Sequence, residues 1–310
     1  MKGPLFYSKI LLFGEYGIIK DSKGLSIPYN FFKGALKSDD TTSEQAIQSN
    51  AGLEKFANYL EDIQQEDLVH FDLEALKTDI AKGMYFDSSI PQGYGIGSSG
   101  ALVAAIYDKY AHDKITVLEN LTREKLLKLK AIFGKMESFF HGRSSGLDPL
   151  NSYLSLPILI NSKDNIESTS LPSQHKEGKG AVFLLDSGIT GETAPMVQIF
   201  MEKMKQEGFR NVIKEKFIKH TDACVEHFLN GDITSLFGHV KQLSHVVLDH
   251  FKPMIPQQFH SLWQRGIETN DYYLKLCGSG GGGYILGFTE DIDKAKKALA
   301  GHKLEVVYNF

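Results

Sequence analysis

The chain has 310 residues, of which 42% are hydrophobic and 23% charged, and its formal net charge is −4. A chain of this length can bury a full core as one large or two medium domains without disulfides. The net charge removes a global attraction to nucleic acid, and no window reaches the ~20 apolar residues that span a bilayer. Cys224 and Cys277 lie far apart, as is typical of free thiols in a reducing compartment. We therefore expect a cytoplasmic protein that acts on a small molecule, without nucleic-acid or membrane partners.

The first predicted elements are two strands of a hairpin, over residues 6–13 and 24–29. A polar surface loop over 37–49 and a helix over about 53–63 follow them. Lys9 stands in the middle of the first strand between apolar neighbours. An isolated strand lysine could simply point to solvent.

A glycine-rich segment at 91–107 reads PQGYGIGSSGALVAAIY and follows a short β-prone stretch at 84–86. Glycines at alternate positions lead into two serines and a run of helix formers, which predicts a strand, a loop and a helix to about residue 110. The main chain of such a loop can approach a phosphate at the helix N-terminus. The pattern G-x-G-x-x-G at 95–100 recurs at 278–283, and the P-loop lysine is missing, so the pattern alone discriminates poorly. The serine hydroxyls could cap the helix or bind a phosphate-bound Mg²⁺.

A second amphipathic helix is predicted with Thr122 as its N-cap. Glu137 lies beside its apolar stripe, where a carboxylate needs a cation or hydrogen-bond donors, or forms a boundary salt bridge. The stripe consists of Leu126, Leu129, Phe133, Met136 and Phe140. A loop at 141–149 then reads HGRSSGLDP. His141 could interact with the helix dipole, and Asp148 before a proline could begin a turn.

The second half of the chain mixes strands and helices, so we expect an α+β fold. The polar stretch up to Gly180 is the expected junction between domains 1–178 and 179–310. Pro195 fits the first turn of a helix. The predicted strands cover residues 156–160, 181–186, 272–277, 283–288 and 304–308; three helical patterns run to about 264, and a last helix covers 292–299.

Three stretches, at 9–15 (KILLFGE), 91–101 and 276–283, resemble the three motifs of the GHMP kinase superfamily, in the family's order. The sequence His-Gly-x-x-Ser-Gly-x-Asp at 141–148, with Glu137 eleven residues before Asp148, is similar to that of mevalonate kinases, as are Leu-Asp-Ser-Gly at 185–188 and Glu192-Thr193. The resemblance implies an ATP-dependent kinase of small alcohols. It also implies a two-domain fold with the active site in the inter-domain cleft.

The resemblance implies a role for each matching residue. Asp148 would accept or orient the proton of the acceptor hydroxyl, with Lys9 beside it, and Ser99 and Glu137 would hold Mg²⁺. Phosphoryl transfer suits such roles, because it needs positioning and charge stabilisation. The residues expected at ATP are Gly93, Gly95, Gly97, Ser98, Ser99, Gly100, Gly278, Gly280 and Gly281, and those expected at the substrate are Glu15, Tyr16, His141, Ser145 and Thr193.

Three departures from the family pattern are visible. Phe6-Tyr7-Ser8 replaces the usual Ala-Pro-Gly, Tyr16 stands at a common histidine, and Gly100 replaces an alanine. Because that histidine is associated with the acceptor pocket, the identity of the acceptor is not fixed by the sequence. Mevalonate is expected first. The alternatives are another GHMP-family kinase, a diphosphomevalonate decarboxylase, or a catalytically silent nucleotide-binding or metabolite-binding regulator. In each case we expect a monomer or homodimer.

Overall fold

The computed structural model describes residues 4–39, 42–65, 67–117, 120–175 and 177–310. The chain forms two compact units that interleave along the sequence. The first unit comprises Met1–Lys9, Ile27–Pro91 and Ile96–Leu156, and the second comprises Ile10–Ser26, Gln92–Gly95 and Pro157–Phe310. Helices and strands are mixed throughout, which confirms the predicted α+β class. The division at residue 178 stays a prediction.

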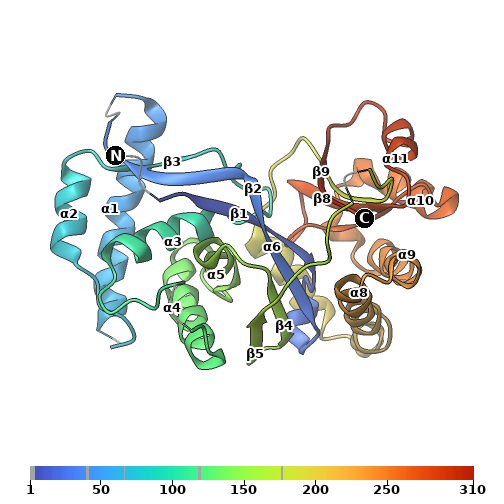
Figure 1. The fold of residues 1–310 in the computed structure, drawn as a ribbon, viewed down its shortest axis with the longest axis horizontal. Coiled ribbons are helices and arrows are strands. Elements are labelled where there is room, and N and C mark those ends of the chain that lie inside the picture. Colours follow the sequence, from blue (N-terminus) through green and yellow to red (C-terminus); the bar gives the residue numbers. More distant parts are fainter. Residues whose placement is uncertain (1–3, 40–41, 66, 118–119, 176) are drawn as a thin grey trace. The chain divides into compact units, whose positions relative to one another are not determined.

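One sheet has five strands in the order β1-β2-β4-β5, with β3 paired to β2 (Figure 1). β2 pairs antiparallel with β3 at one end and with β4 at the other. β2 is longer than the predicted strand at 24–29. The strand bounds are β1 Phe6–Phe13, β2 Gly24–Lys37, β3 Tyr85–Ser88, β4 Ile158–Ser162 and β5 Asn165–Ser168, the last lying in the stretch predicted as a polar junction.

The first unit carries five helices in its described residues (Figure 1). Their bounds are α1 Glu44–Gln64, α2 Leu73–Ala81, α3 Ser98–Tyr110, α4 Arg123–His141 and α5 Leu147–Leu154. Thr122 caps α4 as predicted, since its hydroxyl accepts a hydrogen bond from the Lys125 N–H at 3.3 Å. The predicted loop at 37–49 is wrong in its second half. There Ser43 caps α1 through the Ala46 N–H at 3.2 Å, and Glu44 favours the first turn.

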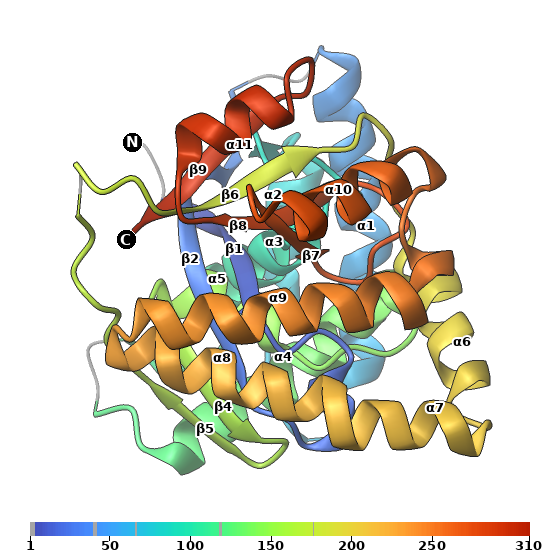
Figure 2. The ribbon, with the colours of Figure 1, turned by 90° about the vertical axis from the view of Figure 1, so that its right-hand side faces the viewer.

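The second unit is built on an antiparallel sheet with the order β7-β8-β6-β9. Its strands are β6 Ala181–Asp186, β7 Tyr273–Leu276, β8 Tyr284–Thr289 and β9 Leu304–Asn309. Every residue of β7 and β8 is buried. Helices α8 (Lys219–Asn230) and α9 (Ile233–His250) pack side by side in Figure 2. The other helices are α6 Thr193–Lys203, α7 Glu207–Val212, α10 His260–Thr269 and α11 Ile292–Ala298.

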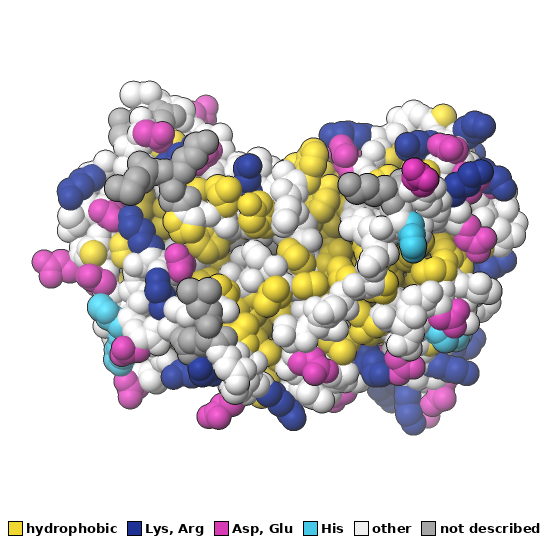
Figure 3. All heavy atoms as spheres, viewed as in Figure 1, with side chains coloured by type: hydrophobic (Ala, Val, Ile, Leu, Met, Phe, Trp, Pro, Cys, Tyr) yellow, Lys and Arg dark blue, Asp and Glu magenta, His cyan; other side chains and the backbone are white. Residues whose placement is uncertain are grey.

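The region predicted as three helices is more finely divided. A π-helical stretch, Ile213–Ile218, joins α7 to α8, and two short 3₁₀ turns separate α9 from α10. On the face shown in Figure 3, lysine and arginine side chains are interspersed with aspartate and glutamate. Among the described residues no helix combines the length and the apolar character that a membrane crossing requires.

Candidate active site

A buried lysine and a carboxylate meet in the first unit. Nζ of Lys9 lies 2.8 Å from Oδ1 of Asp148, and the two side chains are 4% and 35% exposed. The solvent-facing alternative for Lys9 is therefore wrong. Asp148 lies in the first turn of α5 rather than in a loop. The backbone N–H of Lys9 donates to the carbonyl oxygen of Ile96 at 3.0 Å, which ties β1 to the glycine-rich segment.

Two glycines allow the start of α3 to approach this pair. A Cβ added at Gly97 would lie 3.1 Å from Cγ of Lys9, and one at Gly100 would lie 2.7 Å from the carbonyl carbon of Asp148. Gly97 also has a φ of 82°, which few residues other than glycine adopt. Gly100, a departure from the family pattern, is thus required by the close contact with α5.

Ser99 and Glu137 form the second contact in this unit. The Ser99 hydroxyl donates to Oε1 of Glu137 at 2.9 Å, and the Ser144 hydroxyl donates to Oε2. The Ser99 hydroxyl is thus bonded to a carboxylate rather than capping α3, whose N-cap, Gly97, makes no side-chain cap bond. Glu137 is 3% exposed. Burial, followed by the charge of Asp148, raises the pKa of Glu137 to about 7, against the opposing serine hydrogen bonds and Lys9.

The oxygens of Ser99 and Glu137 fit a magnesium ion. Mg²⁺ prefers hard oxygen ligands at about 2.1 Å in an octahedron, whose adjacent ligands lie about 3 Å apart, and it usually takes few protein ligands beside phosphates and waters. The hydroxyl and carboxylate oxygens are 2.9 Å apart. Among the described residues no group of three or more His, Cys, Asp or Glu side chains could hold a metal. A magnesium ion here would need phosphate oxygens to complete its coordination.

Of the two substrate residues predicted at the end of α4 and in the loop that follows, only one joins the Ser99–Glu137 cluster. Nε2 of His141 lies 3.0 Å from the Ser99 hydroxyl, so this residue joins the cluster. Ser145 does not, because it is exposed and its hydroxyl accepts from the Leu147 N–H at 3.4 Å. Ser144, which the sequence analysis passed over, makes the bond to Glu137 instead. Its place in a run of two serines gave no basis for choosing between them.

The second unit contains the other predicted glycines, where three turns pack main chain against main chain. A Cβ at Gly95 would lie 2.5 Å from the Cys277 carbonyl oxygen, and one at Gly191 would lie 2.9 Å from that of Gly280. A hydrogen bond from the Gly191 N–H to the Gly93 carbonyl oxygen, at 2.8 Å, fixes the arrangement. Close packing of the main chain therefore explains why several of these residues are glycines, without any ligand.

Glu15 and Tyr16 lie beside the glycine loop 278–283 in this unit. Nζ of Lys275 lies 2.6 Å from Oε1 of Glu15, and both side chains are almost fully buried. The Tyr16 hydroxyl donates to the Ser279 carbonyl oxygen at 2.6 Å, and the Ser279 hydroxyl donates to that of Thr193 at 3.4 Å. The sequence analysis missed Lys275. Its signal was a lysine within an apolar strand, as at Lys9.

A comparison with family models identifies one part of the chain. Residues 54–155, which include α3, α4, Ser99, Glu137 and Asp148, match the model of the GHMP kinases N terminal domain. Residues 54–155 therefore resemble the N-terminal domain of GHMP kinases. The match ends one residue after α5 and lies within the first unit for most of its length.

Solved structures of GHMP kinases share the fold along the whole chain. The L. major mevalonate kinase in complex with R-mevalonate has a TM-score of 0.64 at 18% identity, covering 100% of this chain and 99% of that one. The Lactococcus lactis galactokinase complexed with galactose gives 0.62 at 11%, covering 98% and 92%. The Streptococcus pneumoniae phosphomevalonate kinase gives 0.60 at 13%, covering 98% of both chains. No curated protein matches the sequence. These likenesses confirm the fold of a GHMP kinase.

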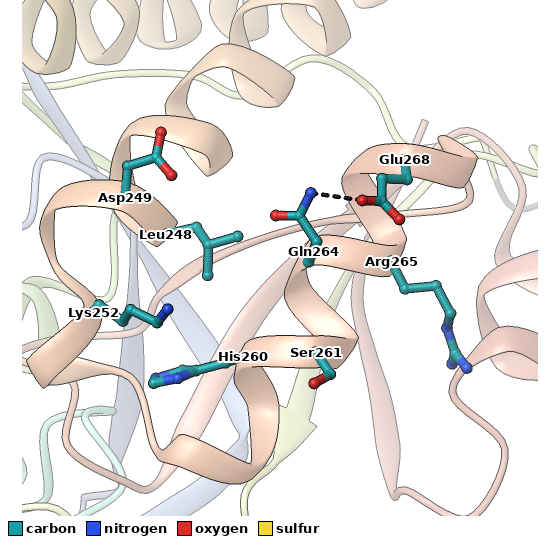
Figure 4. Close-up of a pocket in the computed structure, with 8 residues that line it drawn as sticks. All are labelled: Leu248, Asp249, Lys252, His260, Ser261, Gln264, Arg265 and Glu268. Atoms are coloured by element: carbon teal, nitrogen blue, oxygen red, sulfur yellow. Dashed lines mark hydrogen bonds between the residues drawn. The ribbon is translucent and has the colours of Figure 1, made fainter.

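A cavity of about 460 Å³ lies elsewhere in the second unit (Figure 4). It is lined by Leu248, Asp249, Lys252, His260, Ser261, Gln264, Arg265 and Glu268. None of these residues was predicted for the active site. The Gln264 amide donates to Glu268, the Arg265 guanidinium to the Ala298 carbonyl oxygen, and the His260 ring contacts the Ile255 carbonyl oxygen. Several of its polar groups are thus engaged in local bonds, and we do not place the reaction there.

Proposed function

We propose that this protein is an ATP-dependent kinase that transfers the γ-phosphate to the hydroxyl group of a small molecule. The observation that carries the proposal is the Lys9–Asp148 pair, which lies in the same unit as the Ser99–Glu137 pair. One pair suits proton transfer and the other suits a metal ion. The match of residues 54–155 to the GHMP kinases N terminal domain supports this combination.

Asp148 would take the proton of the acceptor hydroxyl. Its side chain is 35% exposed, so a solute can reach it, and the ammonium of Lys9 at 2.8 Å holds the carboxylate in place. The hydroxyl oxygen then forms a bond to the γ-phosphorus, and the bond from that phosphorus to the bridging oxygen of ADP breaks. The proton moves to Asp148, and ADP leaves with the electron pair.

The start of α3 would receive the phosphates of ATP. Its unpaired N–H groups point out of the helix end, where an anion is stabilised. Ser99 and Glu137 would hold Mg²⁺, which when bound neutralises the charge of the phosphates. The raised pKa of Glu137 fits this role, because a cation beside the buried carboxylate would offset its desolvation.

Mevalonate is the acceptor that we propose first. The residues His141 and Asp148, in the stretch that resembles mevalonate kinases, lie at the cluster just described, and a mevalonate kinase is among the similar structures. Glu15 and Thr193 are further residues that we propose for the acceptor. The division into domains 1–178 and 179–310, a cytoplasmic location and a monomeric or homodimeric state belong to the same proposal.

An ADP-release assay with mevalonate, phosphomevalonate, galactose and homoserine tests this function. We expect turnover that depends on Mg²⁺ and is highest with mevalonate, and loss of turnover in Asp148→Asn. ATP binding without turnover on any acceptor would support a regulatory member instead. Release of CO₂ from a diphosphorylated acid would identify a decarboxylase.

A further inference from the structure

Tyr16 has a strained main chain. Its φ and ψ are 60° and −36°, and the Gly17 N–H donates to the Glu15 carbonyl oxygen at 2.6 Å, which makes Tyr16 the centre of a γ-turn with positive φ. This kind of γ-turn is rare and strained, and a bulky residue with positive φ is unusual. Such a conformation persists when the surrounding contacts favour it, often where function depends on it.

The side chain of Tyr16 supplies those contacts. Its ring stacks on Phe200 with centroids 4.7 Å apart and lies 5.8 Å from that of Phe251. Its hydroxyl donates to the Ser279 carbonyl oxygen at 2.6 Å. Burial raises the pKa of the Tyr16 hydroxyl, so the group keeps its proton and stays a donor. The phenol thus joins the turn to the second residue of the glycine loop.

The neighbouring residue, Glu15, makes a second connection, to the strand that leads into this loop. Glu15 is bonded to Lys275, and the same ammonium donates to the Leu276 carbonyl oxygen at 2.8 Å. Leu276 is the last residue of β7, two positions before the loop begins. The turn therefore fixes the strand that enters the loop and the carbonyl of Ser279 within it.

We propose that Tyr16 is a positioning residue, whose phenol fixes the shape of the glycine loop 278–283 and does not donate a hydrogen bond to the acceptor. The importance of the loop for catalysis rests on the proposed function. A phenol has one O–H donor, and here it donates to the Ser279 carbonyl oxygen. A substrate that needs a hydrogen-bond donor, such as one with a carboxylate, must find that donor in another group of the protein.

Hydrogen–deuterium exchange of Tyr16→Phe tests this without requiring turnover. The N–H groups of Gly281 and Gly283 donate to the carbonyl oxygens of Met254 and Ile189, at 2.7 and 2.6 Å, so their exchange reports opening of the loop. The matched control is Tyr308→Phe, because the buried Tyr308 hydroxyl donates to the Pro172 carbonyl oxygen at 2.7 Å. We expect exchange at 278–283 to become about 2- to 10-fold faster in Tyr16→Phe alone, the range set by one net hydrogen bond.

Either of two results for Tyr16→Phe would overturn the inference. One is loop exchange that equals that of the unsubstituted protein, or that rises equally in Tyr308→Phe. The other is a KM for the acceptor that changes while the KM for ATP and the loop exchange stay constant, since Tyr16 would then contact the substrate directly. If the chain turns over no acceptor, the proposed function fails, and the exchange measurement still decides the role of Tyr16.

Discussion

The ammonium of Lys9 lies 2.8 Å from the carboxylate of Asp148, yet only the lysine is withdrawn from water. A buried cation with a partly exposed anion is an asymmetric pair. The lysine depends on its partner for stabilisation, whereas water also solvates the aspartate. This asymmetry separates the effects that substitution should have on either side of the pair.

Replacing Asp148 by asparagine should leave a folded but less stable protein with little activity, because the buried Lys9 loses its charged partner. We expect kcat to fall by about 10²-fold or more, the usual scale for loss of a general base, with a nearly unchanged KM for ATP. Steady-state kinetics measure kcat and KM, and thermal melts show whether the variant is folded. Asp79→Asn is the control, since Asp79 pairs with Lys109 at 2.7 Å and is similarly exposed, at 31%. Unchanged kcat in folded Asp148→Asn would contradict the catalytic role.

The two buried lysines should respond differently to replacement by methionine. Lys9→Met should lack activity. It should nevertheless stay folded, because Asp148 remains hydrated. Lys275→Met deprives Glu15, whose side chain is 5% exposed, of its ammonium partner. The free energy of unfolding should therefore fall by about 3–5 kcal/mol, as for other broken buried pairs. Urea denaturation of both variants checks this, and equal destabilisation would refute the distinction.

Glu137→Gln should stabilise the metal-free protein at alkaline pH. Because the folded pKa of Glu137, about 7, lies above the ordinary value of 4.5, the folded state disfavours the ionised form. That penalty is absent below pH 4.5, grows between pH 4.5 and 7, and is complete above 7. We expect a melting temperature about 2–4 °C above that of the unsubstituted protein at pH 8, and little difference near pH 5.

The same variant should bind magnesium poorly. A neutral amide is a weaker ligand for a hard cation, so the Mg²⁺ requirement and the KM for ATP should rise together, and excess Mg²⁺ should partly restore the rate. Titration of Mg²⁺ at fixed ATP measures this. Equal Mg²⁺ dependence in both proteins would exclude Glu137 as a ligand.

Two glycines with similar backbones should differ in their tolerance of alanine. Gly95 and Gly188 have φ values of 76° and 73°, but a Cβ at Gly188 would meet nothing within 4 Å, and one at Gly95 would lie 2.5 Å from the Cys277 carbonyl oxygen. Gly188→Ala should cost about 1–2 kcal/mol from the positive φ alone. Gly95→Ala should cost about 2–5 kcal/mol, because overpacking adds to this strain. Denaturation curves for the two variants would show whether the contact matters.

Local patterns in the sequence predicted much of the fold. The β1 strand, the helix that follows the glycine segment and the Thr122 cap depend on neighbouring residues, and all three are confirmed. The start of α1 was missed although Ser43 and Glu44 carry an ordinary capping signal, because the segment has few apolar residues. Here polarity was mistaken for a loop.

Parts of the candidate site could not be predicted from local patterns. Whether Lys9 is buried depends on α3 and α5, which reach it from far along the chain. The positive φ of Tyr16 has no sequence signal, since the bond that accompanies it joins residues 263 positions apart. The choice of Ser144 over Ser145 depends on how the loop closes onto Glu137. In each case packing between distant segments decides the outcome.

The contacts among the glycine turns also bear on how drug resistance could arise. At Gly95, Gly191 and Gly283 the space that a side chain would need is filled by main-chain atoms of another turn. A point mutation there would disturb the packing before it altered a ligand contact. An inhibitor that bonded to the main chain of these turns would leave the protein few substitutions through which to escape it.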